Sequence, residues 1–160
     1  RKFDEALACY NRILRISPGH KDVLFNLGAM LVNMKRPDEA IPHLDEYIAL
    51  EPNFSQTYNL KGSALSQKGL DSEALPVYDK AIELDHTNYD AYYNRALSNM
   101  NLENYKDVIR DCLEILNVLE NDIDTIKLIY DAYLKDGNDD EAQKWKSALD
   151  EHFSMSGKGF

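Results

Sequence analysis

The histidines and cysteines are the first candidates in this sequence for binding a metal or acting as a nucleophile. The histidines lie far apart, and no two stand at metal-ligand spacing with a third ligand nearby. Neither cysteine has a base next to it in the sequence. We therefore expect no catalytic residue, metal or cofactor, and interpret the histidines as surface residues and the cysteines as reduced core residues. These residues are His20, His43, His86, His152, Cys9 and Cys112.

Acidic pairs and glycines also have structural explanations. Asp38 and Glu39, like the acids at 139–141, stand at the expected starts of helices, where negative charge complements the helix dipole. Gly62 and Gly69 do not form a phosphate loop, because no strand precedes them and no Gly-Lys-Ser/Thr follows. Catalysis is not needed to account for either group.

The elements that carry these residues recur every 34 residues. Apolar residues return at three- and four-residue steps within each unit, which predicts two helices joined by a short turn. Stacked helix pairs of this kind bury a continuous core, since one pair cannot cover its own apolar face. The landmarks of one unit are Tyr58, Gly62, Leu65, Gly69, Ala74, Tyr78 and Ala81, and 34 positions earlier stand Leu24, Gly28, Leu31, Lys35, Ala40, Leu44 and Tyr47.

These landmarks predict where the units begin and end. We expect the second helix of a truncated unit at 1–20, full units at 21–54, 55–88 and 89–122, a degenerate C-terminal unit at 123–153, and a flexible tail at 154–160. The chain then looks like a piece of a longer array.

Single residues in these units carry further structural expectations. Small residues at Gly28 and Gly62 should let paired helices approach closely, beside large Leu44 and Tyr78. Pro42 and Pro76 share a position that we place near the start of a second helix. In the last unit we expect Trp145 to replace Lys146 in the core.

Composition narrows the class of partner. The formal net charge is −10, and every unit after residue 20 is acidic, which disfavours nucleic acid and anionic membranes. No apolar run approaches the ~20 residues of a membrane span. We expect a cytoplasmic protein, although a targeting segment could precede Arg1.

The spacing Leu24-x-x-Leu27-Gly28-x-x-Leu31, followed by Ala40, Leu44, Tyr47 and Pro52, resembles the tetratricopeptide repeat. The resemblance covers nearly the whole chain and implies an all-α, right-handed solenoid of antiparallel helix pairs. It departs from the pattern at His86, Glu120, Tyr130 and Lys146.

By this resemblance, the first helices of the repeats line a concave groove that binds a peptide segment of another protein. None of the lining positions is expected to face the core, Val32 and Leu128 included. Of the ten tyrosines, only Tyr93 is expected to point clearly into the groove. The expected groove residues are Phe25, Asn26, Ala29, Asn33, Gln56, Asn59, Leu60, Ser63, Tyr93, Asn94, Leu97, Asn101, Lys127 and Asp131.

The groove composition suggests which peptide would bind. Amides both donate and accept hydrogen bonds, so they suit a peptide backbone, and the acidic surface favours a neutral or basic segment over an acidic one. An equally simple interpretation is that any one asparagine is merely solvated. The leading hypothesis is a non-catalytic adaptor or scaffold.

Three alternatives stay open. The chain could be the substrate-recruiting or oligomerising arm of a larger enzyme, since Asn26 and Asn94 resemble the asparagine ladder of the glycosyltransferase that modifies protein serine and threonine. It could resemble the co-chaperones that clamp acidic chaperone tails, but Asp124 stands where that clamp needs a cation. It could also self-associate through exposed repeat ends.

Overall fold

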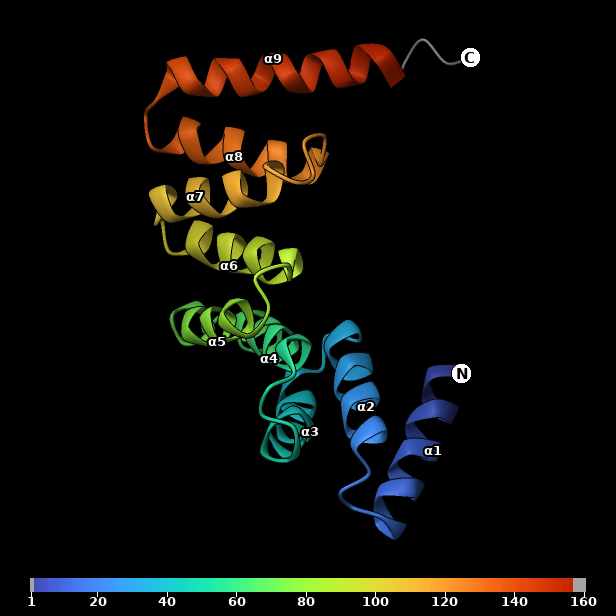
Figure 1. The fold of residues 1–160 in the computed structure, drawn as a ribbon. Helices are drawn as coiled ribbons and strands as arrows, with labels where there is room; N and C mark the ends of the chain where they lie inside the picture. Colours follow the sequence, from blue (N-terminus) through green and yellow to red (C-terminus); the bar gives the residue numbers. More distant parts are fainter. Residues whose placement is uncertain (1, 157–160) are drawn as a thin grey trace. The chain divides into compact units, whose positions relative to one another are not determined.

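The computed structural model describes residues 2–156, with side chains from 5 to 152, and these residues form nine α-helices and no strand (Figure 1). The helices are α1 (Lys2–Ile16), α2 (Lys21–Asn33), α3 (Pro37–Leu50), α4 (Ser55–Gln67), α5 (Asp71–Leu84), α6 (Tyr89–Asn101), α7 (Tyr105–Leu116), α8 (Ile123–Lys135) and α9 (Asp139–Ser156).

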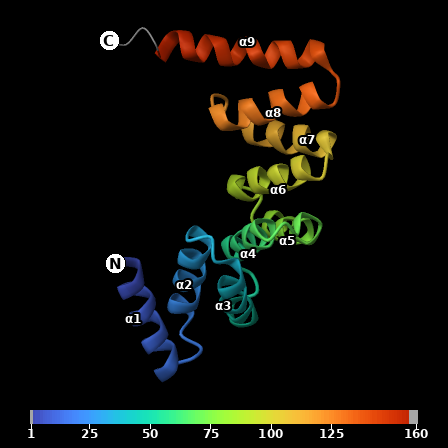
Figure 2. The same cartoon turned by 180° about the vertical axis from the view of Figure 1, so that it is seen from behind.

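Neighbouring helices pack in pairs. Helix α2 packs against α3, α4 against α5 and α8 against α9, and each pair is joined by a short turn that reverses the chain direction (Figures 1 and 2). Pro37 occupies the first turn of α3, where its missing N–H has no helical partner. The predicted all-α class with antiparallel helix pairs is confirmed.

The helix bounds bear on several sequence-based expectations. Helices α4, α6 and α8 begin at the predicted starts of repeats, and we retain the repeat limits as a proposal. Pro42 and Pro76 lie inside α3 and α5, not at their starts, because both helices begin five residues earlier. Each proline thus removes one intrahelical hydrogen bond. Helix α9 continues to Ser156, past the predicted start of the tail, and residues 157–160 lie outside the described part.

The chain divides into two compact units, the first ending at Ala91 and the second beginning at Tyr92. A core cluster of the first unit contains Leu27, Leu31, Ala40 and Leu44. A core cluster of the second unit combines residues of α6, α7, α8 and α9, among them Ala96, Val108, Cys112, Ile129 and Leu149.

On α9, Trp145 takes the place of Lys146 in the core, as expected from the sequence. Trp145 packs against the core cluster, while the Lys146 side chain is exposed. A small rotation of the last helix relative to the repeat pattern therefore substitutes an aromatic side chain for a charged one.

Glycine is required where two paired helices approach most closely. A Cβ atom on Gly28 would lie 2.6 Å from Leu44 Cδ2, and one on Gly62 would lie 2.5 Å from Tyr78 Cε1. Real Cβ contacts are essentially never so short. The predicted pairing of a small residue with a large one is confirmed for these two helix pairs.

One cysteine differs from its predicted environment. Cys112 is fully buried, as expected, but Cys9 is exposed. Cys9 stands beside Tyr10, which does pack against the first-unit core, and adjacent helical residues point about 100° apart. The prediction of a core position for Cys9 was therefore wrong.

Within residues 2–156, no helix combines the length and apolar character needed to cross a membrane.

Candidate functional site

The predicted groove residues fall on four helices in two units. Those on α2 and α4 belong to the first unit, and those on α6 and α8 belong to the second. We call the two sets the first-unit face and the second-unit face. The first-unit face consists of Phe25, Asn26, Ala29, Asn33, Gln56, Asn59, Leu60 and Ser63, and the second-unit face of Tyr93, Asn94, Leu97, Asn101, Lys127 and Asp131.

On the first-unit face, α2 presents a strip of accessible side chains. Asn26 and Asn33 are exposed and stand seven residues apart, so they share one side of the helix, with half-buried Ala29 between them. Its small side chain leaves the backbone of α2 approachable at this point. This strip therefore presents two amide side chains on one side of α2.

Helix α4 forms the other side of the first-unit face. It packs against α2, and the Gln67 side-chain amide donates a hydrogen bond to the Val32 carbonyl over 3.1 Å. Gln56, Leu60 and Ser63 are half-buried. The Asn59 side chain, in contrast, is only 4% exposed. Its amide is therefore not presented to solvent, unlike those of α2.

Two predicted lining positions belong to the cores. Val32 clusters with Leu31 and Ala64, and is thus held between α2 and α4. Leu128 is likewise buried, in the second-unit core with Ile129. The expectation that no lining position faces the core was wrong here, because the same positions also pack each first helix against its neighbours.

Near the starts of α2 and α4 and the end of α3, three aromatic rings contact one another. Phe25 lies 5.5 Å from Tyr47 and 5.3 Å from Phe54, and Tyr47 lies 5.9 Å from Phe54, measured between ring centroids. Phe25 and Tyr47 are half-buried, and Phe54 is 44% exposed. We call these three residues the aromatic trio. Sequence reasoning identified Phe25 but not its contact with Tyr47 and Phe54.

Charged side chains stand beside the aromatic trio. The Lys21 ammonium forms an exposed ion pair with the Glu51 carboxylate. Burial raises the pKa of the Tyr47 phenol, and the negative charges of Glu51 and Asp22 raise it further against the opposing effect of Lys21. The Tyr47 hydroxyl therefore stays protonated at neutral pH, within the field of two carboxylates.

The second-unit face contains both half-buried and exposed side chains. Tyr93 is half-buried and packs against the core, so its ring serves the fold as well as the surface. Burial raises the pKa of its hydroxyl, with smaller contributions from Asp124 and Asp122. Asn94 is half-buried. The exposed members are Leu97, Asn101, Lys127 and Asp131.

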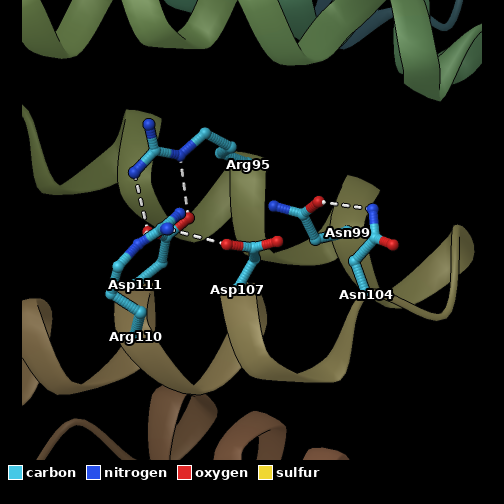
Figure 3. A network of polar contacts seen from close by, with 6 residues as sticks. All are labelled: Arg95, Asn99, Asn104, Asp107, Arg110 and Asp111. Atoms are coloured by element: carbon cyan, nitrogen blue, oxygen red, sulfur yellow. Dashed lines mark hydrogen bonds and ion pairs between the residues drawn. The ribbon is translucent and has the colours of Figure 1, made fainter.

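A buried ion pair joins α6 to α7 in the second unit (Figure 3). The Arg95 guanidinium on α6 donates two hydrogen bonds, of 2.8 and 2.7 Å, to the carboxylate of Asp111 on α7. Asp111 is fully buried, and Arg95 also lies over the Tyr92 ring at 5.5 Å. Such bidentate pairs fix geometry, so this contact holds α6 against α7.

Sequence reasoning missed this ion pair, although the repeat carries a signal for it. Arg95 occupies the repeat position of Leu27, and Asn99 that of Leu31, so two core positions are polar in the fourth repeat. Asn99 is buried and accepts a hydrogen bond from the Asn104 amide over 3.1 Å. A polar residue at a core position predicts a partner nearby.

The arrangement offers little for chemical catalysis. No group of three or more His, Cys, Asp or Glu among the described side chains is placed to hold a metal ion. Desolvation raises the pKa of the Cys112 thiol to about 12, which opposes formation of a nucleophilic thiolate. The features that remain are surface amides, exposed apolar groups and aromatic rings.

Comparisons with known proteins agree with this description. A crystal structure of the MamA protein superimposes with a TM-score of 0.90 and 25% sequence identity, over 99% of this chain and 87% of that one. The human protein O-mannosyl-transferase TMTC3 is 32% identical over 97 residues, which is 60% of this chain. The peroxisomal targeting signal receptor of Candida glabrata is 28% identical over 112 residues, or 70% of this chain.

This chain spans 11% of the length of the human mannosyl-transferase and 18% of the yeast receptor. Two family models, described as tetratricopeptide repeat and TPR repeat, match residues 1–64 and 62–103. The repeat spacing, the antiparallel helix pairs and these matches lead to one conclusion: the chain belongs to the tetratricopeptide repeat family, whose fold serves protein interaction.

Proposed function

We propose that this chain is a non-catalytic interaction module that holds an extended peptide segment of a partner protein, neutral or basic in charge, on the first helices of its repeats. The observation that carries the proposal is the strip on α2, where Asn26 and Asn33 are exposed on one side of the helix with Ala29 between them. An amide supplies both a donor and an acceptor, and so matches the alternating groups of a peptide backbone.

The rest of the proposed site follows the predicted lining residues. On α4, which packs against α2, Gln56 and Ser63 are half-buried members of the first-unit face. Within the second unit, Leu97 on α6 offers an exposed apolar contact of its own. The acidic charge of the repeats supports a neutral or basic peptide. A relative named as a receptor for a targeting signal supports recognition of a short segment.

A peptide library displayed on phage and selected against the whole chain tests this function. We expect enriched peptides whose affinity, measured by fluorescence anisotropy, falls about tenfold in the Asn26→Ala/Asn33→Ala variant, because two hydrogen bonds of about 0.5–1.5 kcal/mol are lost. The control is Asn53→Ala/Asn121→Ala, which removes two exposed amides in connecting segments.

Three results would contradict the proposal. One is the absence of any enriched peptide, and another is equal affinity for the α2 variant and its control. The third is enrichment of peptides with acidic C-termini, which would favour a carboxylate clamp instead. Thermal unfolding of each variant must match that of the parent chain, so that a loss of binding is not a loss of folding.

A second candidate function is a recruiting arm of a larger enzyme, which the likeness to protein O-mannosyl-transferase TMTC3 favours. Reading the open reading frame on both sides of residues 1–160 tests it, since a catalytic domain joined to the array would be visible there. The cytoplasmic location and the self-association remain predictions; sedimentation of the chain with and without residues 1–20 tests the latter.

A further inference from the structure

Phe54 of the aromatic trio is partly exposed and occupies a repeat position whose side chain caps a helix in two other repeats. Phe54 is the residue immediately before α4, and 34 and 68 residues later the same position is held by Asn88 and Asp122. Asn88 accepts a hydrogen bond from the Ala91 N–H at 3.2 Å, and Asp122 accepts one from the Thr125 N–H at 3.0 Å. These two residues cap the helices that follow them.

Phe54 cannot cap α4, because its side chain has no acceptor atom, and no side-chain capping bond is made there. His20, one repeat earlier, also makes no capping bond. Phe54, however, differs in also leaving a large aromatic ring 44% exposed. The missing cap does not stabilise α4, and although the Phe54 ring packs against Phe25 and Tyr47, its exposed part is available to a partner.

The charges beside the rings indicate what the surface would attract. Asp22 stands one helical turn before Phe25, and Glu51 lies close enough to Tyr47 to raise its pKa. Lys21 is the basic group at this place, and it is paired with Glu51 in a bridge in which both side chains are about half exposed. Exposed pairs of this kind contribute about 0–1 kcal/mol, so an incoming cation can compete for Glu51.

The second unit shows a ring whose cation comes from the chain itself. There the Arg95 guanidinium lies 5.5 Å from the centre of the Tyr92 ring. Aromatic faces attract cations through their negative quadrupole, and acids nearby strengthen the attraction. In the first unit, the exposed part of Phe54 is open to a cation from outside.

We propose that Phe25, Tyr47 and Phe54, with Asp22 and Glu51 beside them, form a binding site for a cationic side chain, lysine or arginine, of the partner peptide. This proposal rests on the peptide-binding function above and adds a specificity anchor at one end of the first-unit face. The guest's aliphatic stem lies along the exposed part of Phe54, and its charge faces the two carboxylates.

The site can be tested without knowing the natural peptide. The ¹⁵N-labelled whole chain is titrated with N-acetyl-arginine amide, and separately with the citrulline and glutamate analogues, while amide chemical shifts are recorded. Citrulline has nearly the shape of arginine but no charge. We expect saturable shifts at residues 22, 25, 47, 51 and 54 with the arginine probe, much weaker binding of citrulline, and none of glutamate at this place.

Two variants of Phe54 distinguish the effect of its aromatic face from the effect of its apolar side chain as such. Phe54→Leu keeps an apolar side chain but removes the π face, and we expect the arginine probe to bind it about three- to thirtyfold more weakly. Phe54→Asn places a capping residue there, as at Asn88, and should remain folded while losing the site. The control is Leu134→Ala, which removes an exposed apolar side chain on α8 and should bind as the parent does.

The proposal is overturned if citrulline binds as well as arginine, if Phe54→Leu binds as the parent chain does, or if the shifts spread over the acidic surface without saturating. Its failure is distinguishable from failure of the peptide-binding function. Library peptides that need Asn26 and Asn33, but carry no basic residue and tolerate Phe54→Leu, would remove only the cation site. A saturable arginine site without any enriched peptide would remove only the peptide-binding function.

Discussion

Whether a side chain in this protein is buried or exposed depends on which side of its helix it occupies. Cys112 stands at the repeat position of Leu44 and Tyr78 and is fully buried, while Cys9 stands one residue before a core position and is exposed. The same reasoning explains Trp145, which lies in the core, and exposed Lys146 beside it. A displacement of one residue is enough to reverse the environment.

The two thiols should therefore react very differently in the native chain. Burial raises the pKa of Cys112 to about 12, so at pH 8 only about one in 10⁴ of these thiols is ionised, and the side chain is also inaccessible. Titration with a disulfide reagent at pH 8 should modify one thiol rapidly, and peptide mapping should identify it as Cys9. In denaturant both thiols should react. Rapid modification of Cys112 in the folded chain would contradict its burial.

The sequence predicted residues at the repeat landmarks well and those between them poorly. Gly62 beside Tyr78 followed from the period alone, because close helix contact restricts this position here as it does at Gly28. The contacts of Phe54 and the buried amide of Asn59 did not follow. Both depend on which neighbouring elements cover a position, and the spacing of one helix contains no information about that.

At the scale of elements, the turn between paired helices contains one position with a left-handed backbone conformation. Lys35, Gly69, Glu103 and Gly137 are 34 residues apart, and all four have positive φ, between 57° and 76°. After α2, the N–H of Arg36 reaches back to the Leu31 carbonyl over 2.9 Å, closing the C-terminal end of the helix. Glycine adopts this conformation without strain, but lysine and glutamate do not.

Replacing the two strained residues should stabilise the chain. We expect Lys35→Gly and Glu103→Gly each to increase the free energy of unfolding by about 1 kcal/mol, because a side chain in the left-handed region costs about 1–2 kcal/mol and glycine's greater unfolded-state entropy offsets part of that. Urea unfolding followed by circular dichroism measures the change.

The matched variants for this prediction are Gly69→Ala and Lys68→Gly. Gly69 has φ 75° with open space around its Cβ position, so its substitution should destabilise through backbone strain alone. Lys68 has φ −85°, where glycine brings no relief and only adds unfolded-state entropy. If Lys35→Gly and Lys68→Gly shift the transition in the same direction, strain at Lys35 is not the cause.

At the scale of the whole molecule, the chain divides into two compact units although its repeat period is regular. The two compact units meet within α6, between Ala91 and Tyr92, although the 34-residue spacing continues through this helix without interruption. The helix pairs could be predicted because each is set by local spacing. The division could not, since it depends on the summed contacts of many side chains, including the buried Arg95–Asp111 pair of the second unit.

Local changes should consequently destabilise one unit more than the other. In repeat proteins each helix pair is stabilised mainly by its neighbours, so unfolding need not be concerted. Asp111→Ala leaves the Arg95 guanidinium without its buried partner and should cost the second unit about 3–5 kcal/mol. Gly62→Ala forces a Cβ into the Tyr78 ring and should cost the first unit about 1–3 kcal/mol.

Trp145, the single tryptophan, packs against the second-unit core and so reports on that unit, while circular dichroism reports on all helices. With Asp111→Ala, the urea midpoint of tryptophan fluorescence should fall further than that of circular dichroism; with Gly62→Ala the order should reverse. Gly19→Ala is the control, since its Cβ would meet Leu50 at an ordinary 3.8 Å. Should both probes shift equally in both variants, the units unfold together as one cooperative array, and the division at α6 has no energetic meaning.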